Sequence, residues 1–230
     1  MRRLSSLIAV ALMVAPAISS AQMDETVKKV TNGGVKIAGW QGQLDPGSKD
    51  AVNDAKIEMV GKDIHVMTGP AIGYFGSANK ASGDYTVKAT FVEKEYMALN
   101  DHPHPYGIAI GGNDIGTPNA TYLYCTAYGN GTYIVRGFNP TPFAPPGGRR
   151  PTPSDAVHKA AGKGSPVTQE ISMTVKGDDV SCAINGTTVA TFKKADVVGA
   201  GKLKSLDGEY GVRFAHNTEG TVSGLSVSKP

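Results

Sequence analysis

The feature that most constrains the fold is a series of alternating segments within residues 167–228. In residues 169–176, apolar side chains alternate with Ser, Thr and Lys, and residues 180–184 repeat the pattern. A period of two places successive side chains on opposite faces of a strand, so each segment should bury one face and expose the other. Asn185-Gly186 predicts a tight hairpin, because both central residues of such a turn need a positive φ. We therefore predict an antiparallel meander here.

The order of these segments resembles a known superfamily. A strand, Lys-Gly-Asp-Asp (176–179), a strand, Asn185-Gly186, a strand and then Gly-Glu-Tyr-Gly-Val-Arg-Phe (208–214) resembles the C-terminal half of concanavalin A-like lectin/glucanase domains. The pattern looks most like the 3-keto-disaccharide hydrolase-type branch of secreted bacterial proteins. In that family, a Gly-Ile-Ala-x-Gly-Gly strand (107–112) and a Tyr-rich strand (121–128) occupy the middle of the domain. The resemblance covers most of residues 57–228.

This resemblance implies a fold and a place for a site. The expected fold is all-β, a two-sheet antiparallel β-sandwich of the concanavalin-like jelly-roll type. In such folds one sheet is concave and carries the glycan site. The high glycine and proline content, 29 and 14 residues, is ordinary for short strands joined by turns.

The first residues are typical of a secretory signal peptide. Arg2 and Arg3 precede an uncharged run, residues 7–18, and Ser19-Ser20-Ala21 offers small side chains for cleavage. The run is too short for a membrane span. We therefore expect cleavage near Ala21, a periplasmic or secreted protein and no membrane span.

Residues 22–230 are long enough for one β-sandwich domain with a single core. The formal net charge of +3 includes Arg2 and Arg3, so a chain without its first 21 residues is close to neutral. A neutral surface is a poor match for a polyanion, so nucleic acid is not an expected partner.

Residues 139–166 interrupt the strand rhythm with seven prolines. Proline cannot donate to a β-ladder, so this segment is predicted to be a long loop inserted in the sandwich. Long loops in compact domains are functional lids or spacers. A solvated insertion is one interpretation; in the other, Arg149 and Arg150 contact an acidic ligand.

Tyrosines follow the strand predicted over residues 121–128. Leu123, Cys125 and Ala127 should face the core, which places Tyr122, Tyr124 and Tyr128 on the opposite face. A tyrosine ring with its hydroxyl suits the mixed apolar and polar surface of a sugar. We expect these rings to stand exposed as a sugar platform, with Arg136 on the next strand as a further ligand-binding residue. The alternative is that tyrosine simply favours strands.

Carboxylates are missing where this superfamily's glycosidases carry them. Laminarinase-type members have Glu-x-Asp-x-x-Glu on a central strand, and retaining hydrolysis needs two carboxyl groups about 5 Å apart. Residues 121–138 contain no Asp or Glu. His216 near the end of the penultimate strand matches a histidine common in 3-keto-disaccharide hydrolase-type domains. His216, Arg213 and His104 are therefore the catalytic candidates if the protein is an enzyme.

Metal binding has few candidates. His102 and His104 lie two apart, so both can bind one ion only if the chain turns between them. Asp114, in Gly112-Asn113-Asp114, offers oxygen ligands of the kind that Ca²⁺ prefers, but the sequence is also an ordinary turn. We expect no cofactor, with Ca²⁺ as the alternative.

Cys125 and Cys182 are both predicted on the apolar faces of their strands. In an oxidising compartment they can form a disulfide, and the alternative is two buried thiols.

These observations favour an exported, lectin-like domain that binds carbohydrate or another polyhydroxylated ligand and lacks hydrolytic activity. The first alternative is a glycoside-cleaving enzyme, a hydrolase or lyase, related to 3-keto-disaccharide hydrolases. The second is a structural envelope module that binds protein.

Overall fold

The computed structural model describes residues 26–229, so the predicted signal peptide lies outside the described residues. The first sheet contains eight strands. In spatial order they are β1 (Gly34–Val35), β3 (Lys56–Val60), β4 (Asp63–Met67), β16 (Glu219–Ser228), β6 (Tyr85–Glu93), β12 (Val167–Lys176), β13 (Asp179–Ile184) and β14 (Thr187–Lys193).

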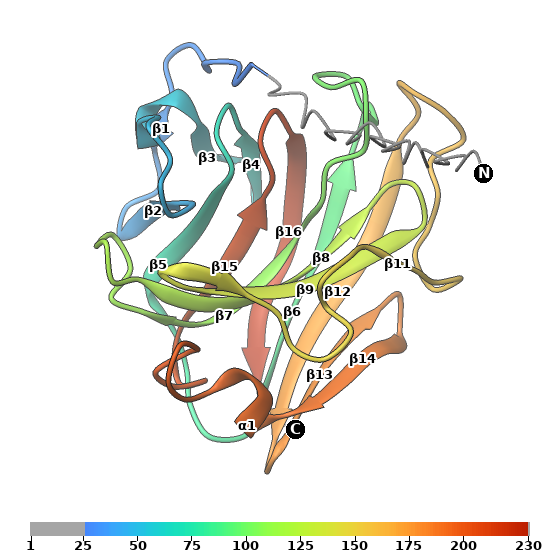
Figure 1. Ribbon diagram of the computed structural model, residues 1–230. Coiled ribbons are helices and arrows are strands. Elements are labelled where there is room, and N and C mark those ends of the chain that lie inside the picture. The colour runs from blue at the N-terminus through green and yellow to red at the C-terminus, as the bar shows by residue number, and fades with distance from the viewer. Residues whose placement is uncertain (1–25, 230) are drawn as a thin grey trace, which may run out of the picture.

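The second sheet also contains eight strands. Its order is β10 (Thr141–Phe143), β9 (Thr132–Asn139), β8 (Thr121–Tyr128), β7 (Tyr106–Asn113), β15 (Gly208–Phe214), β5 (Ile72–Ala81) and β2 (Trp40–Leu44), and β11 (Thr152–Pro153) pairs with β9. Residues 26–229 also contain two short helices, the 3₁₀ helix η1 (Val52–Asp54) and α1 (Lys194–Val197). Figure 1 shows the two sheets as layers of a sandwich.

The predicted all-β, two-sheet fold is confirmed, and among the described strands every pairing is antiparallel except that of β1 with β3. The hairpin prediction is also confirmed: Asn185 and Gly186 have φ of 49° and 80°, between the antiparallel strands β13 and β14. The meander prediction is correct only for β12–β13–β14. Strand β15 crosses to the second sheet and β16 returns to the first, because both sheets need strands to cover the shared core.

The core lies between the sheets and is built from the inward residues of both. Phe91 of β6 stacks on Tyr106 of β7 with ring centroids 5.7 Å apart, and Tyr106 stacks on Phe214 of β15 at 5.8 Å. The Tyr85 hydroxyl donates to the carbonyl of Leu206 at 2.6 Å, which satisfies a polar group that the core would otherwise isolate.

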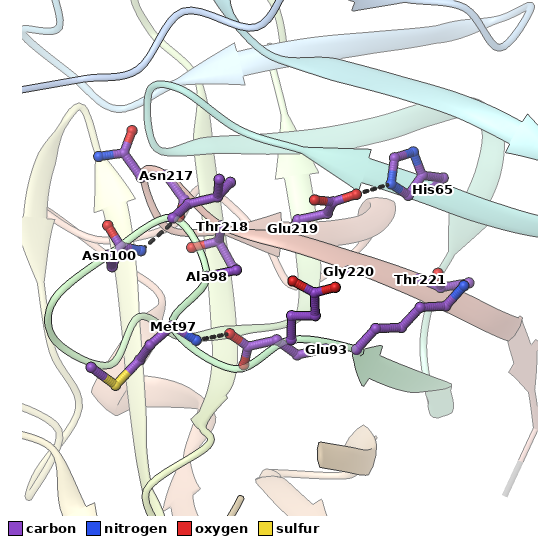
Figure 2. A pocket seen from close by; sticks show the side chains of 13 residues that line it. His65, Glu93, Met97, Ala98, Asn100, Asn217, Thr218, Glu219, Gly220 and Thr221 are labelled. Atoms are coloured by element: carbon purple, nitrogen blue, oxygen red, sulfur yellow. Dashed lines mark hydrogen bonds and ion pairs between the residues drawn. The ribbon is translucent and has the colours of Figure 1, made fainter. Parts of the chain in front are cut away.

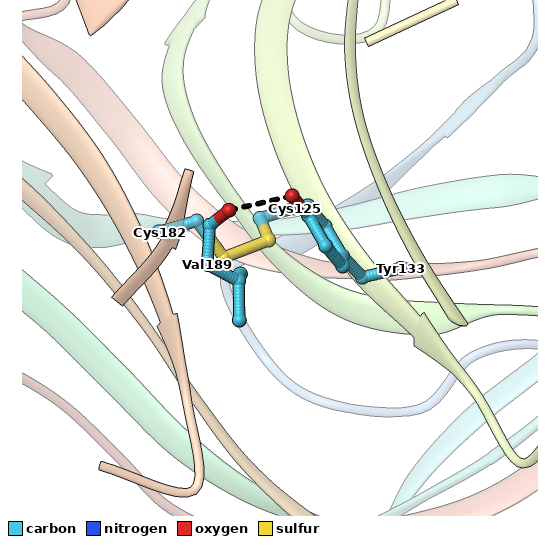
Figure 3. Close-up of a disulfide and its surroundings, with 4 residues drawn as sticks. All are labelled: Cys125, Tyr133, Cys182 and Val189. Carbon is cyan, nitrogen blue, oxygen red and sulfur yellow. Dashed lines mark hydrogen bonds between the residues drawn. A yellow bond between two sulfur atoms is a disulfide. The ribbon is translucent and has the colours of Figure 1, made fainter. Parts of the chain in front are cut away.

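A disulfide between Cys125 and Cys182 joins the two sheets through this core (Figure 3). Cys125 lies on β8 and Cys182 on β13, with their Cα atoms 6.3 Å apart. Beside the sulfurs, the Tyr133 hydroxyl donates to the carbonyl of Val189 at 2.5 Å, a second link between the sheets. Strands β8 and β13 are therefore held together covalently across the sandwich.

Residues 139–166 are not the strand-free loop that their prolines predict. Strands β10 and β11 both pair with β9 at the edge of the second sheet, where Pro142 lies opposite Phe138 and Pro153 opposite Thr132. An edge position tolerates proline, because its missing N–H is not needed by a further strand.

Strands β2 and β5 were missed by the sequence pattern. Strand β5 begins Ile72-Gly-Tyr-Phe-Gly76 and is buried on both faces in this stretch, so it shows no polar alternation. Within residues 26–229, no helix is long and apolar enough to cross a membrane.

Candidate functional site

The outer face of the second sheet, which points away from the core, is hollowed into a cleft of about 560 Å³ that we call the central cleft. Strands β8, β9 and β15 provide its floor, and residues 102–105 and 215–216 provide a wall. The central cleft brings together the three catalytic candidates, His104, Arg213 and His216. It also contains three of the residues predicted to bind ligand. These are Tyr124, Tyr128 and Arg136.

Two connections between the sheets position the wall. The connection from β6 to β7 carries residues 102–105, and the connection from β15 to β16 carries His216. They run side by side, because the Ala215 amide donates to the Pro105 carbonyl at 2.9 Å and the Asn100 side chain donates to the Asn217 carbonyl at 2.6 Å. Histidines far apart in the sequence thereby meet at one end of the sandwich.

Three imidazoles cluster in this wall. The ring centroid of His104 lies 4.0 Å from that of His216 and 4.5 Å from that of His102. His104 Nδ1 lies 2.6 Å from the His216 carbonyl, which can only accept, so Nδ1 carries the hydrogen. His104 Nε2 is 2.8 Å from His102 Nε2, and His102 Nδ1 is 2.8 Å from Asp101 Oδ1. The result is a hydrogen-bonded series that runs from the His216 carbonyl through His104 and His102 to the Asp101 carboxylate.

Arg213 lies in the floor and is almost wholly buried, with a relative exposure of 6%. Its Nη2 donates to Asp45 Oδ2 at 2.7 Å and its Nη1 to the Phe214 carbonyl at 2.7 Å. The guanidinium also lies over the Tyr124 and Phe138 rings, 5.2 and 5.8 Å from their centroids. The cation is therefore fixed on three sides and presents one orientation to the cleft.

Asp45 was not predicted from the sequence. It follows β2 in an Asp-Pro-Gly sequence that reads as a turn, and its partner Arg213 lies 168 positions away. Burial raises the pKa of Asp45, and the neighbouring Arg213 opposes this. For Arg213, burial favours the neutral form, but Asp45, Tyr122 and Tyr124 outweigh it and raise the pKa further. The two groups form an ion pair in which the Arg213 side chain is buried and the Asp45 side chain is half-buried.

The expectation that the three tyrosine rings stand exposed is wrong for Tyr122 and Tyr124 and is met only in part for Tyr128. The alternation itself is as expected, since Leu123, Cys125 and Ala127 lie in the core and the tyrosines face outward. Yet Tyr122 is 1% and Tyr124 7% exposed, and only Tyr128 is half-buried.

Neighbouring rings on the same face cover the two buried tyrosines. The Tyr122 ring packs edge-on against Phe75 with centroids 5.3 Å apart, and lies 5.3 Å from Phe138, its direct cross-strand partner. Ile115 and Ala120, from the connection after β7, belong to the same outer cluster. The tyrosines therefore build a second hydrophobic cluster, and the surface left to a ligand is an edge of Tyr124 and the Tyr128 ring.

The remaining predicted residues lie away from the central cleft. Arg149 is exposed and meets the cleft only through its backbone carbonyl, which accepts from Arg136 Nη2 at 2.5 Å. Arg150 lines a different hollow, between β9 and β14. Asp114 forms an ion pair with Lys204 at the turn after β7 and does not lie with His102 and His104. Within residues 26–229, no three His, Cys, Asp or Glu side chains form a group that could hold a metal ion.

A second hollow of about 420 Å³ adjoins the central cleft along the same face. The two share Asp45, Pro46 and Phe138, and the second hollow also contains Tyr122. Its far rim is the connection after β7, which is held by the Gly116 amide donating to the Gln43 side chain at 2.8 Å. Together they form an extended trough across the outer face.

A smaller cavity of about 170 Å³ opens at the same end of the sandwich, against the first sheet (Figure 2). Glu93 borders it and accepts a hydrogen bond from the Met97 amide at 3.1 Å, whereas its Oε2 is buried with no hydrogen-bond partner. Burial raises the pKa of Glu93 to about 7, despite the opposing Met97 bond. His65 and Glu219, 2.8 Å apart, form another part of the border.

No known protein family and no curated protein sequence matches the chain. Solved structures do. The carbohydrate-binding module CBM66 from Bacillus subtilis is similar over 86% of this chain and 99% of its own, with 11% identity and a TM-score of 0.55. A Bacillus subtilis protein of unknown function with a galectin-like fold is similar over 83% and 89%, with 12% identity and a TM-score of 0.51. The chain has the concanavalin-like sandwich fold. At these identities the likeness establishes no more than that.

Proposed function

We propose that the protein binds carbohydrate in the central cleft and does not hydrolyse it. The observation that carries this proposal is the composition of the cleft. It combines the half-buried Tyr128 ring and the small exposed part of Tyr124 with guanidinium groups from Arg136 and Arg213. Apolar ring surface beside a few convergent polar groups is what the apolar patches and hydroxyls of a sugar require.

The fold also supports this proposal. One of the similar structures is a carbohydrate-binding module, and the same sandwich can serve unrelated functions. We also propose that the protein is exported, with residues 1–21 removed, and that nucleic acid is not its ligand. The near-neutral charge of the remaining chain supports the second point.

The absence of a carboxylate pair supports binding without hydrolysis. Among residues 26–229, Asp45 is the only acidic residue that lines the central cleft, and it is engaged by Arg213. A two-carboxylate mechanism needs a second, suitably spaced acid.

A glycoside-cleaving enzyme is the second candidate, because the structure brings His104, His216 and Arg213 into one cleft. Imidazole is the side chain most often used as a general acid or base, and Arg213 could stabilise a developing negative charge. The ligand would then be cleaved by acid–base chemistry at histidine and not by paired carboxylates.

A glycan array followed by calorimetry on untagged protein beginning at residue 22 tests the proposal. Tyr128→Ala should weaken glycan binding at least about fivefold, corresponding to about 1 kcal/mol. Tyr133→Phe is the matched control, because Tyr133 lies on the adjacent strand but faces the core; its affinity should stay within about twofold. Binding to no glycan, or equal losses in both variants, would contradict the proposal.

Incubating the same protein with 3-keto-glycosides and with unmodified β-glucans tests the enzyme candidate. Turnover that is lost in His216→Ala would establish catalysis and replace the binding proposal. We expect no turnover of either substrate.

A further inference from the structure

Arg136 is a cation that the central cleft does not neutralise. It lies on β9, directly opposite Tyr124 of β8, and it is half-buried. Its Nη2 donates to the Arg149 carbonyl at 2.5 Å, and no Asp or Glu of residues 26–229 forms an ion pair with it. A guanidinium held by a neutral carbonyl keeps its full charge and most of its donors.

The carboxylates near the cleft are already engaged elsewhere. Asp45 Oδ2 accepts from Arg213 at 2.7 Å, and Asp101 Oδ1 lies 2.8 Å from His102 Nδ1 at the rim. Arg213 and Asp45 largely cancel each other's charge. Arg136 therefore adds a positive charge to the ligand surface that no described carboxylate balances, and partial burial strengthens its interactions relative to open water.

The positive charge of Arg136 acts on Tyr124 and Tyr128, the two tyrosines that line the central cleft. Burial raises the pKa of Tyr128, and Arg136 opposes this. Burial likewise raises the pKa of Tyr124, against the effect of Arg213 and Arg136. The guanidinium is thus next to the aromatic surface on which a sugar ring would lie, within the reach of a substituent on that ring.

We propose that the carbohydrate bound in the central cleft is acidic, and that Arg136 binds its carboxylate or sulfate group. This inference rests on the proposed function and narrows its ligand class. The planar guanidinium presents paired N–H groups that match two oxygens of a carboxylate or sulfate. The Arg149 carbonyl fixes the orientation of this group, so that binding an anion costs less side-chain entropy.

Calorimetry with matched sugars tests the proposal. The probes are trisaccharides of galacturonate, glucuronate and mannuronate, the carboxyl-reduced form of each, and their O-sulfated neutral counterparts. At least one acidic member should bind at least about tenfold more tightly than its reduced form, as expected for a charge-assisted hydrogen bond. Its affinity should fall with added salt.

The variant Arg136→Gln should lose this preference while retaining residual affinity for the neutral sugar. Arg136→Lys should keep part of the preference for acidic sugars, because the positive charge remains but the paired N–H groups of the guanidinium are lost. Arg150→Gln is the matched control, since Arg150 lines a separate hollow, and its preference should be unchanged. Near-identical unfolding midpoints would show that these substitutions leave the fold intact.

The outcomes separate this inference from the proposed function. Neutral sugars that bind as tightly as acidic ones would overturn the inference and leave the function standing. An acidic preference that survives in Arg136→Gln, or that disappears equally in Arg150→Gln, would also overturn the role of Arg136. If no sugar of either class binds, both proposals are wrong.

Discussion

The outer faces of the two sheets differ in how much of their surface is buried. On the first sheet, β12 alternates strictly, with each inward residue buried and each outward one exposed or half-buried. On the second sheet, seven of eight residues are buried in both β7 and β8. The first sheet therefore has one buried face, whereas the central strands of the second sheet are buried on both faces.

Small outward residues explain how the second sheet buries both faces. Gly107 and Ala109 of β7 and Gly211 of β15 are small and share the outer face, so rings from β5, β8 and β9 can lie across them. A Cβ at Gly107 would lie 2.1 Å from the Cys125 carbonyl oxygen, which shows how closely β7 and β8 approach. The outer cluster of Phe75, Tyr122 and Phe138 then acts as a rigid support under the trough. A binding site on this face therefore rests on packed rings and not on mobile side chains.

The largest expected effect comes from removing the disulfide that joins the two sheets. Replacing both Cys125 and Cys182 with Ala removes a cross-link whose residues are 57 positions apart. In the chain-entropy model, closing such a loop stabilises the native state by about 4 kcal/mol. Urea unfolding should measure this loss. Thiol titration of the unreduced, denatured wild type should find no free thiol, and two thiols would contradict the link.

The next effect compares the two outer faces directly. Phe75→Ala, in the outer cluster of the second sheet, should lower the free energy of unfolding by about 3 kcal/mol, because a buried ring leaves a cavity. Glu170→Ala, exposed on the outer face of β12, should change it by less than about 0.5 kcal/mol. Equal effects in urea unfolding would show that the two faces do not differ as the structure indicates.

The smallest effect concerns Glu93 at the end of β6. Because its folded pKa, about 7, exceeds the ordinary value of 4.5, the native state prefers the neutral acid. The neutral Glu93 side chain therefore contributes fully to the free energy of unfolding below about pH 4.5, and this contribution is lost as the pH rises through 7. Glu93→Gln keeps a neutral side chain, so it should be about 2 kcal/mol more stable than wild type at pH 8 and similar at pH 4.5.

Unfolding curves recorded from pH 4.5 to 8 check this expectation. The control is Glu95→Gln, because Glu95 borders the same cavity but is exposed. Its pH dependence should follow that of the wild type. Parallel curves for Glu93→Gln and wild type would show that Glu93 ionises without cost in the folded protein.

The strands of the first sheet were easier to predict from the sequence than those of the second. Strands of the first sheet have one wet face, so their alternation is visible in the sequence, as in 169–176 and 180–184. Strand β5 of the second sheet was missed because its first five residues, which include Gly and aromatic side chains, are buried on both faces. Proline in residues 139–166 also concealed β10 and β11, which need few donors at a sheet edge.

The residues of the candidate site could also be predicted only in part from the sequence. Tyr124 and Tyr128 could be selected by residue type and strand position, because strand geometry fixes which side chains share a face. Arg213 and His216 were selected through the resemblance to 3-keto-disaccharide hydrolase-type domains. The degree of burial of the tyrosines could not be predicted, since it depends on Phe75 and Phe138 from other strands. Asp45 carried no signal, because an Asp-Pro-Gly turn looks the same whether or not an arginine lies opposite.

The sequence by itself determined the alternation of the strands, the Asn185-Gly186 hairpin and the faces on which Leu123 and Tyr124 lie. These depend on local backbone geometry, which a few neighbouring residues set. Only the tertiary structure decided that β15 leaves its sequence neighbours for the other sheet, that His104 meets His216, and that Arg213 pairs with Asp45. Each of these joins segments distant in the chain, and such contacts depend on the packing of the whole sandwich, which no local pattern encodes.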